Sequence, residues 1–322
     1  MAGILIFGEA TDSGISRATL QIATAAADLA EALGEPLSGA LIGSQLGRAA
    51  DEFHCGLASL YLVEGVHYRP YTAEAYVVAA QAVIATAAPS VALFVQGPDT
   101  RDWVPQLAAR IGTGLVTDCT GFATERGSLI VSKPVNGGGV LAEFIVHGTP
   151  RMATVRPGDF QPRVGPASAE RIHLAVAPPP ERVTVLAETA LQASGGPRLK
   201  DAKIVIGGGR GVGGTNNWHL IEDTAAVLGA AIGCSRPIAD SGCVPSTHQV
   251  GLSGTSIAPD LYVAVGISGA AQHLAGITAA KTVIAINTDA SADIFMRADY
   301  GVVDDCREVL PAFIERVKQL RT

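Results

Sequence analysis

Short apolar runs alternate with longer segments of helical periodicity through residues 1–112. The apolar runs have the length of buried strands and lie at residues 4–7, 40–43, 60–63 and 91–95. Helical periodicity covers residues 18–33, 73–87 and 103–110. Strands that alternate with helices are typical of βαβ units, so this region predicts a parallel sheet covered by helices.

The pattern changes after Gly112. Three further runs predict strands joined by short turns, at residues 121–125, 129–135 and 141–146, and residues 152–156 are a candidate fourth strand. A glycine turn at residues 136–139 separates two of them. This meander predicts an antiparallel extension of the first sheet.

A loop-like region follows the meander, at residues 160–170 and 177–181. The second of these segments holds three consecutive prolines, which cannot stand in a helix interior or a central strand. We therefore expect a domain boundary near residue 195. It gives an N-terminal α/β domain at residues 1–195 and a second domain at residues 196–322.

The second domain has the pattern of a fresh α/β unit. Its predicted strands lie at residues 203–206, 260–266, 282–287 and 300–303. Its predicted helices lie at residues 218–228 and 307–320. The first strand runs directly into a glycine-rich turn at residues 207–214, which is the arrangement of a Rossmann-like domain.

Composition narrows the function classes. The formal charge of −7 comes without a lysine or arginine cluster, so we expect no nucleic-acid partner. We find no apolar stretch of the ~18–20 residues that a membrane helix needs, so we expect no membrane insertion. The first residues read as a strand rather than a targeting segment, and the five scattered cysteines favour reduced thiols over a disulfide framework or a zinc site. These features predict a cytoplasmic protein.

Glycine-rich turns carry the candidate chemistry. Gly209, Gly211 and Gly214 satisfy G-x-G-x-x-G between a strand and a helix, where backbone amides approach a pyrophosphate. The same turn nearly matches a phosphate-binding P-loop, but Thr215 stands in the place of the required lysine, which argues against phosphoryl transfer. Two more clusters, at residues 249–254 and at Ser268-Gly269, favour a dinucleotide over a merely tight crossover.

Eight motifs occur in order along the second domain. They are Gly207-Gly-Gly-Arg-Gly211, Gly233-Cys-Ser-Arg236, Gly242-Cys-Val-Pro245, Gln249-Val-Gly251, Ala258-Pro-Asp-Leu-Tyr262, Gly266-Ile-Ser-Gly-Ala-Ala-Gln-His-Leu-Ala-Gly276, Ala285-Ile-Asn287 and Ala298-Asp-Tyr-Gly301. Together they resemble the alpha subunit of electron-transfer flavoproteins. The first half agrees more loosely, through Gly8-Glu9 and residues 107–118.

The resemblance implies one FAD in the second domain and a beta subunit as the partner in a heterodimer. The pair would carry electrons between a donor dehydrogenase and an acceptor oxidoreductase, without a catalytic residue or a metal on this chain. The cofactor-binding residues that it implies are Arg210, Ser235, Arg236, Gln249, Val250, Gly251, Leu252, Ser253, Gly254, Thr255, Gly266, Ser268, Gly269, Ala270, Gln272, His273, Asn287 and Asp305.

The resemblance also implies roles within this set. The two arginines would lie against the flavin and its phosphates. The hydroxyl of Ser253 would lie near the flavin N5, where most members have threonine, and Thr255 stands where the family has lysine. His273 would lie beside the flavin C2 carbonyl, although a lone histidine near a helix start is also an ordinary polar cap. Ser268, Gly269 and Gln272 would hold the pyrophosphate, and Asn287 and Asp305 would reach the adenosine half.

Two other function classes stay open at this point. The G-x-G-x-x-G turn also suits an NAD-dependent oxidoreductase, which needs an acidic ribose ligand about 20 residues beyond the glycines. A nucleotide-binding regulatory module without redox work would bind AMP and no flavin. The spectrum of the purified protein separates these classes.

Overall fold

The computed structural model describes residues 3–125, 128–136, 140–157, 160, 162, 165, 169–180, 182–187, 197–199, 202–277 and 280–321. The chain divides into two compact units, which are residues 1–135 with 141–189, and residues 136–140 with 190–322. The boundary predicted at residue 195 and most of the glycine turn at 136–139 lie outside the described residues. No described helix has both the length and the apolar character needed to cross a membrane.

The first unit is built on a seven-stranded sheet in the order β12-β5-β4-β1-β6-β11-β7, in which every neighbouring pair is parallel. The strands are β1 (Ile4–Gly8), β4 (Leu37–Gly43), β5 (Ser59–Glu64), β6 (Val91–Val95), β7 (Leu115–Cys119), β11 (Arg151–Val155) and β12 (Glu170–His173). The helices are α1 (Arg17–Leu33), α2 (Gly47–Glu52), α3 (Ala73–Ala87) and α4 (Pro98–Ile111), with a 3-10 turn η1 (Val66–Tyr68). A two-stranded ribbon, β2 (Ala10–Thr11) and β3 (Gly14–Ile15), follows β1.

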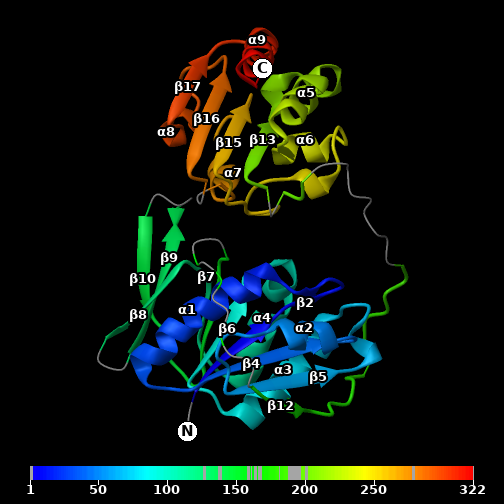
Figure 1. Ribbon diagram of the computed structural model, residues 1–322, viewed down its shortest axis with the longest axis vertical. Helices are drawn as coiled ribbons and strands as arrows, with labels where there is room; N and C mark the ends of the chain where they lie inside the picture. The colour runs from blue at the N-terminus through cyan, green and yellow to red at the C-terminus, as the bar shows by residue number, and fades with distance from the viewer. Residues whose placement is uncertain are drawn as a thin grey trace. The chain divides into compact units, whose positions relative to one another are not determined.

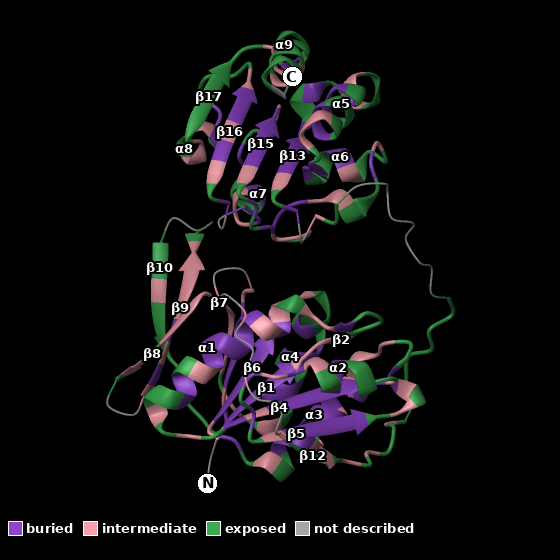
Figure 2. Cartoon of the chain, in the orientation of Figure 1, coloured by how far each residue is buried: buried purple, intermediate pink, exposed green. Residues whose placement is uncertain are grey.

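Alternation along β1 shows how helices cover both faces of this sheet. Ile4 and Ile6 pack into the core that includes α1, whereas Leu5 and Phe7 pack into the core that includes α3 and α4. All four side chains are buried, as Figure 2 shows for the central strands. The parallel α/β fold predicted from the alternating pattern is confirmed.

The strands predicted after Gly112 do not all continue the seven-stranded sheet. β8 (Gly121–Glu125), β9 (Ser128–Val135) and β10 (Val140–Ile145) form a sheet of their own, in the order β10-β9-β8, with β8 and β9 antiparallel (Figure 1). The candidate fourth strand, β11, instead lies inside the parallel sheet between β6 and β7. Its buried side chains need helices on both faces, which only the large sheet offers.

The second unit is a five-stranded parallel sheet in the order β14-β13-β15-β16-β17. The strands are β13 (Ile204–Gly208), β14 (Ala231–Cys234), β15 (Leu261–Val265), β16 (Thr282–Asn287) and β17 (Tyr300–Val303). The α-helices are α5 (His219–Leu228), α6 (Arg236–Asp240), α7 (Ala271–Leu274), α8 (Ile294–Arg297) and α9 (Cys306–Arg321), and 3-10 turns lie at η3 (Arg210–Val212), η4 (Gly214–Asn217) and η5 (Ser246–His248). Counted within the unit, the strand order is 2-1-3-4-5, one of the two common doubly wound orders.

Candidate functional site

The strand order of the second sheet reverses between β13 and β15. β14, the next strand along the chain after β13, lies on one side of it, and β15 lies on the other. In doubly wound sheets, ligands bind outside the carboxyl ends of the strands at such a point. All eighteen predicted cofactor-binding residues stand at the carboxyl ends of the strands or in the segments that follow them (Figure 1).

Two loops meet backbone to backbone at this reversal point. The amide of Gly209 donates to the Val265 carbonyl at 2.8 Å, and the amide of Gly211 donates to the Gly266 carbonyl at 3.0 Å. A Cβ on Gly209 would lie 2.2 Å from the Gly266 oxygen, and Gly266 itself has a φ of +61°. Gly209 and Gly211 are therefore needed for the close contact between the two loops. Gly214 has nothing within 4 Å of its would-be Cβ, and its φ of +77° suits only the turn.

The two predicted arginines lie beside these loops. Arg210 is exposed in the turn after β13. The amide of the buried Ser235 donates to the Gly208 carbonyl at 3.0 Å, which holds the start of α6 against the end of β13. Arg236 follows with its Nε 3.3 Å from an Asp240 carboxylate oxygen, and its side chain is 68% exposed. Both positive charges are accessible at the carboxyl edge.

The loop at residues 249–255 is anchored at two points. The Val250 amide donates to the Cys234 carbonyl at 2.9 Å, so the loop starts at the end of β14. The Leu252 amide donates to the Gln272 carbonyl at 2.7 Å, which ties the loop to α7. A Cβ on Gly251 would lie 2.8 Å from the same carbonyl oxygen, so the tie requires glycine there.

Within this loop, the hydroxyl group of Ser253 accepts one hydrogen bond and can still donate its proton to a ligand. The Gln249 side-chain amide donates to the Ser253 hydroxyl oxygen at 2.9 Å, so that oxygen acts as an acceptor while its own proton is not used in this bond. The Thr255 amide donates to the Gln249 carbonyl at 2.8 Å, and the Gly251 amide donates to the Thr255 carbonyl at 3.2 Å. The backbone of the loop is thus closed on itself, with Ser253 exposed.

The segment that leads from β15 into α7 presents polar groups to solvent. Ser268, Ala270 and Gln272 are exposed. Between them, Gly269 has a φ of +87°, and a Cβ there would lie 2.1 Å from the Ile294 nitrogen. This close packing on α8 fixes the backbone of the segment and leaves its outer side open.

His273 is the buried polar side chain of this segment. Its Nε2 lies 2.8 Å from the hydroxyl of Tyr262, and its buried Nδ1 makes no hydrogen bond of normal geometry with the described residues. Burial lowers the pKa of His273 to about 4, and the Val250 carbonyl only partly opposes this, so the imidazole is neutral near pH 7. The polar-cap alternative does not hold, because the ring is 7% exposed and caps no helix amide in the described residues.

Asn287 and Asp305 occupy the far side of the same edge. The Asn287 side-chain amide donates to the Ile267 carbonyl at 2.9 Å, so this residue braces the loop after β15. The carboxylate of Asp305 accepts from the side chain and the amide of Arg307, and these bonds hold the pKa of Asp305 at about 2. Asp305 is therefore a charged residue directly before α9.

The residues present fit a flavin dinucleotide. Glycine-rich loops border the reversal point, exposed arginines stand beside it, and a buried imidazole nitrogen makes no hydrogen bond of normal geometry with the described residues. The sequence reasoning missed Tyr262, the partner of that imidazole. Its signal was an aromatic residue within an otherwise aliphatic strand, in a chain with only 5% aromatic residues.

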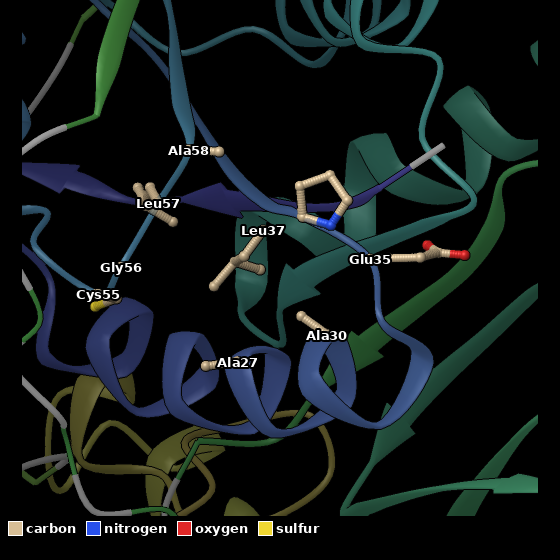
Figure 3. A pocket seen from close by; sticks show the side chains of 9 residues that line it. Ala27, Ala30, Glu35, Leu37, Cys55, Gly56, Leu57 and Ala58 are labelled. Carbon is tan, nitrogen blue, oxygen red and sulfur yellow. The ribbon is translucent and has the colours of Figure 1, made fainter. Parts of the chain in front are cut away.

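A cavity of about 340 Å³ lies elsewhere, in the first unit (Figure 3). It is lined in part by Ala30, Leu37 and Leu57. Because Leu37 begins β4, the cavity lies at the amino end of that strand, opposite the edge where doubly wound sheets bind ligands.

Comparison with known proteins covers both units. Residues 4–185 match the electron transfer flavoprotein domain, and residues 198–278 match the electron transfer flavoprotein FAD-binding domain. The electron transfer flavoprotein subunit alpha of Thermoanaerobacterium thermosaccharolyticum is 34% identical over 325 residues, covering 99% of this chain and 98% of that protein. The subunit alpha of Bacillus subtilis is 35% identical over 324 residues, covering 98% of each chain, and that of Mycobacterium leprae is 33% identical over 323 residues, covering 99% of each.

Proposed function

The chain belongs to the electron transfer flavoprotein family as an alpha subunit, and we propose that it carries electrons on one FAD bound along the carboxyl edge of the second sheet. The FAD supplies the redox chemistry, since its ring accepts and releases electrons. The chain binds the cofactor, orients it and sets the charge around it.

The phosphates would lie against the segment between β15 and α7. Ser268, Ala270 and Gln272 are exposed there, and backbone amides at the start of a helix are suited to bind phosphate oxygens. The exposed guanidinium groups of Arg210 and Arg236 would add positive charge. Asn287 and Asp305 would line the adenosine end.

The flavin ring would lie in the loop at residues 249–255. The Ser253 hydroxyl proton is available to donate to the ring, because its oxygen already accepts from Gln249. The unpartnered Nδ1 of His273 would meet a carbonyl of the ring, where a hydrogen-bond donor stabilises negative charge that develops on reduction. These two donors come from separate loops that are tied together through Leu252 and Gln272.

A beta subunit would complete the carrier. Relatives that match this chain over nearly their whole length are named as alpha subunits, which implies a second chain. In the first unit, Leu141 and Ile145 of β10 are 61% and 55% exposed, and exposed apolar side chains of this kind favour a protein partner (Figure 2). A flavin dehydrogenase as donor, a downstream oxidoreductase as acceptor and a cytoplasmic location complete the proposal.

The observation that carries the proposal is the match of residues 198–278 to the FAD-binding domain, and the buried His273 Nδ1 on α7, which makes no hydrogen bond of normal geometry, supports it. The test is co-expression with a beta-subunit gene from the same organism, followed by an absorption spectrum and identification of the nucleotide released on denaturation. We expect a yellow heterodimer that releases FAD. A colourless chain that releases only AMP would support the regulatory alternative.

The NAD-dependent alternative has a specific structural requirement. The acidic ribose ligand of such enzymes follows the second strand of the unit, about 20 residues beyond the glycines. In this chain β14 ends at Cys234, and Ser235 and Arg236 follow it. Release of NAD from the purified protein, with no flavin, would favour this alternative.

A further inference from the structure

Tyr262 and His273 form a buried polar pair within an apolar part of the second unit. Tyr262, on β15, is fully buried, and its hydroxyl lies 2.8 Å from Nε2 of His273, on α7. Neighbours in the same core are aliphatic, among them Ile257 and Ile277. Two polar side chains placed together in such surroundings require a hydrogen-bonding reason, since burying them without partners is costly.

The main chain of β13 makes room for this pair. A Cβ on Gly207 would lie 2.1 Å from the Tyr262 hydroxyl oxygen and 2.7 Å from the ring carbon that bears it. Any other residue at position 207 would push the phenol away from the imidazole. The first glycine of the glycine-rich run thus leaves space for the Tyr262 phenol. The contact between Tyr262 and His273 depends on this glycine.

The direction of the hydrogen bond follows from counting donors and acceptors. A neutral imidazole has one N–H and one acceptor nitrogen. If Nε2 donated to the phenol oxygen, both the phenol proton and the Nδ1 lone pair would lack partners among the described residues. If the phenol donates to Nε2, only the Nδ1 proton makes no hydrogen bond of normal geometry, and the Val250 carbonyl, which raises the pKa of the ring, is an acceptor near it. The second arrangement leaves fewer buried groups unsatisfied, so it is favoured.

The ionisation of both groups agrees with this direction. Burial raises the pKa of Tyr262, so the phenol keeps its proton. Burial lowers the pKa of His273 to about 4, the Val250 carbonyl acts in the opposite sense, and no charged side chain contributes. The imidazole is therefore neutral, with a single proton to place.

We propose that Tyr262 is a positioning residue that holds the proton of His273 on Nδ1, so that the neutral imidazole donates to a carbonyl oxygen of the bound flavin. This inference rests on the proposed function for the identity of the acceptor, but the tautomer itself does not depend on the ligand. The flavin carbonyl would give the Nδ1 proton an acceptor with normal hydrogen-bond geometry, which the nearby Val250 carbonyl does not provide in the structure. His273 is then a neutral donor rather than a cation beside the ring.

The tautomer is measured directly by long-range 1H–15N NMR on the heterodimer labelled with 15N-histidine, with His273→Gln to assign the signal. At pH 7 we expect a protonated Nδ1 and an unprotonated Nε2 for His273. A protonated Nε2 alone, or a doubly protonated ring, would overturn the proposal. This wild-type spectrum decides the question even if a tyrosine variant fails to fold.

A variant then tests the tyrosine. Tyr262→Phe keeps the ring and removes the hydroxyl, and Tyr300→Phe, at a tyrosine that is 66% exposed on β17, is the matched control. We expect Tyr262→Phe to give a mixture of His273 tautomers and to weaken FAD binding about two- to tenfold, as the loss of one oriented hydrogen bond implies. Tyr300→Phe should change neither.

The outcomes separate the two claims. A wild-type heterodimer that binds no flavin but shows the Nδ1–H tautomer removes the proposed function and keeps the role of Tyr262 in orienting the imidazole. A flavin-binding heterodimer in which Tyr262→Phe leaves both the His273 tautomer and the FAD affinity unchanged removes the role of Tyr262 and keeps the proposed function.

Discussion

The two parallel sheets of this chain differ in the residues that border the point where the strand order reverses. In the first unit, the strand order reverses between β1 and β6, and the segment after β1 holds a carboxylate. The Ser16 hydroxyl donates to Glu9 at 3.2 Å, and a Cβ on Gly97, just beyond β6, would lie 3.3 Å from the Glu9 carboxylate. In the second unit, the corresponding point is bordered by Gly209 and Gly266.

Backbone amides make the same contrast. In the first unit, the Ile15 amide donates to Glu52 at 2.9 Å and the Leu46 amide donates to Glu64 at 3.0 Å. These carboxylates occupy backbone amide donors, and their negative charge disfavours a phosphate beside them. In the second unit, residues 266–274, which include α7, hold no acidic residue. Carboxylates of the second unit accept from amides farther along the edge, at Asp289 and Asp305, so the contrast between the two units is confined to the reversal point.

The largest expected effect comes from filling the glycine contact of the second unit. Gly266→Ala combines a φ of +61° with a Cβ only 2.6 Å from the Gly211 carbonyl carbon. We expect it to lower the free energy of unfolding by about 3 kcal/mol or more and to abolish FAD binding. Urea unfolding and flavin content of the heterodimer measure both.

Gly229→Ala is the matched control for this change. Gly229 has nearly the same backbone angle, φ +65°, but nothing lies within 4 Å of its would-be Cβ. We expect a loss of about 1–2 kcal/mol from the left-handed backbone alone, with FAD still bound. Equal losses in the two variants would mean that the contact between the loops is not tight.

The second-largest expected effect concerns the ion pair between Asp118 and Arg156 in the first unit. Asp118 accepts two hydrogen bonds from Arg156, at 3.0 and 2.6 Å, and the two side chains are only 20% and 12% exposed. Asp118→Asn suits the backbone, since asparagine tolerates the φ of +64° there. We expect a loss of about 2–3 kcal/mol of unfolding free energy, because the asparagine amide replaces a carboxylate whose charge strengthens both hydrogen bonds from Arg156.

An exposed ion pair of the same unit calibrates that loss. Asp51 pairs with Arg171 at 2.7 Å, and its side chain is 66% exposed. Asp51→Asn should change the unfolding free energy by less than about 1 kcal/mol. If Asp118→Asn were equally mild, the carboxyl edge of the first unit would not depend on internal pairing.

The third effect concerns the redox behaviour of the second unit. Ser253→Ala removes a hydroxyl whose proton is available to the ring, while the loop keeps its backbone bonds. We expect FAD to stay bound and its reduction potential to change by tens of millivolts, which is about one hydrogen bond. Ser253→Thr should have a smaller effect, since it keeps the hydroxyl. Unchanged potentials in Ser253→Ala would assign this serine to the turn alone.

The smallest effect is the acid response of the first unit. The Arg48 side chain and then the Ile15 amide lower the pKa of Glu52 below its ordinary value of 4.5. A lowered folded pKa gives stability that is present above about pH 4.5 and is lost as pH falls through the folded value. Glu52→Gln should therefore flatten the fall in urea midpoint below about pH 5. Glu31→Gln, at an exposed position on α1, should leave it unchanged.

The sequence by itself determined the elements whose signal is local. The predicted bounds of α3, β6 and β16 agree with the structure, because each has a strong apolar pattern between clear breakers. β12 was missed because it is an edge strand of sequence Glu-Arg-Ile-His without an apolar run. The motifs of the second half likewise identified the family, because each motif is a run of consecutive residues that can be read without knowledge of the fold.

Only the tertiary structure decided which partners these residues meet. β11 lies in the parallel sheet rather than the meander, and Gly207 faces Tyr262, a residue 55 positions along the chain (262 minus 207). The difference between the two reversal points likewise depends on tertiary contacts, because the carboxylates of Glu9, Glu52 and Glu64 accept hydrogen bonds from other segments of the chain. Periodicity reports only a residue's own strand or helix, whereas strand order, loop packing and the partner of a buried nitrogen depend on contacts between distant segments, which form when the sheet assembles.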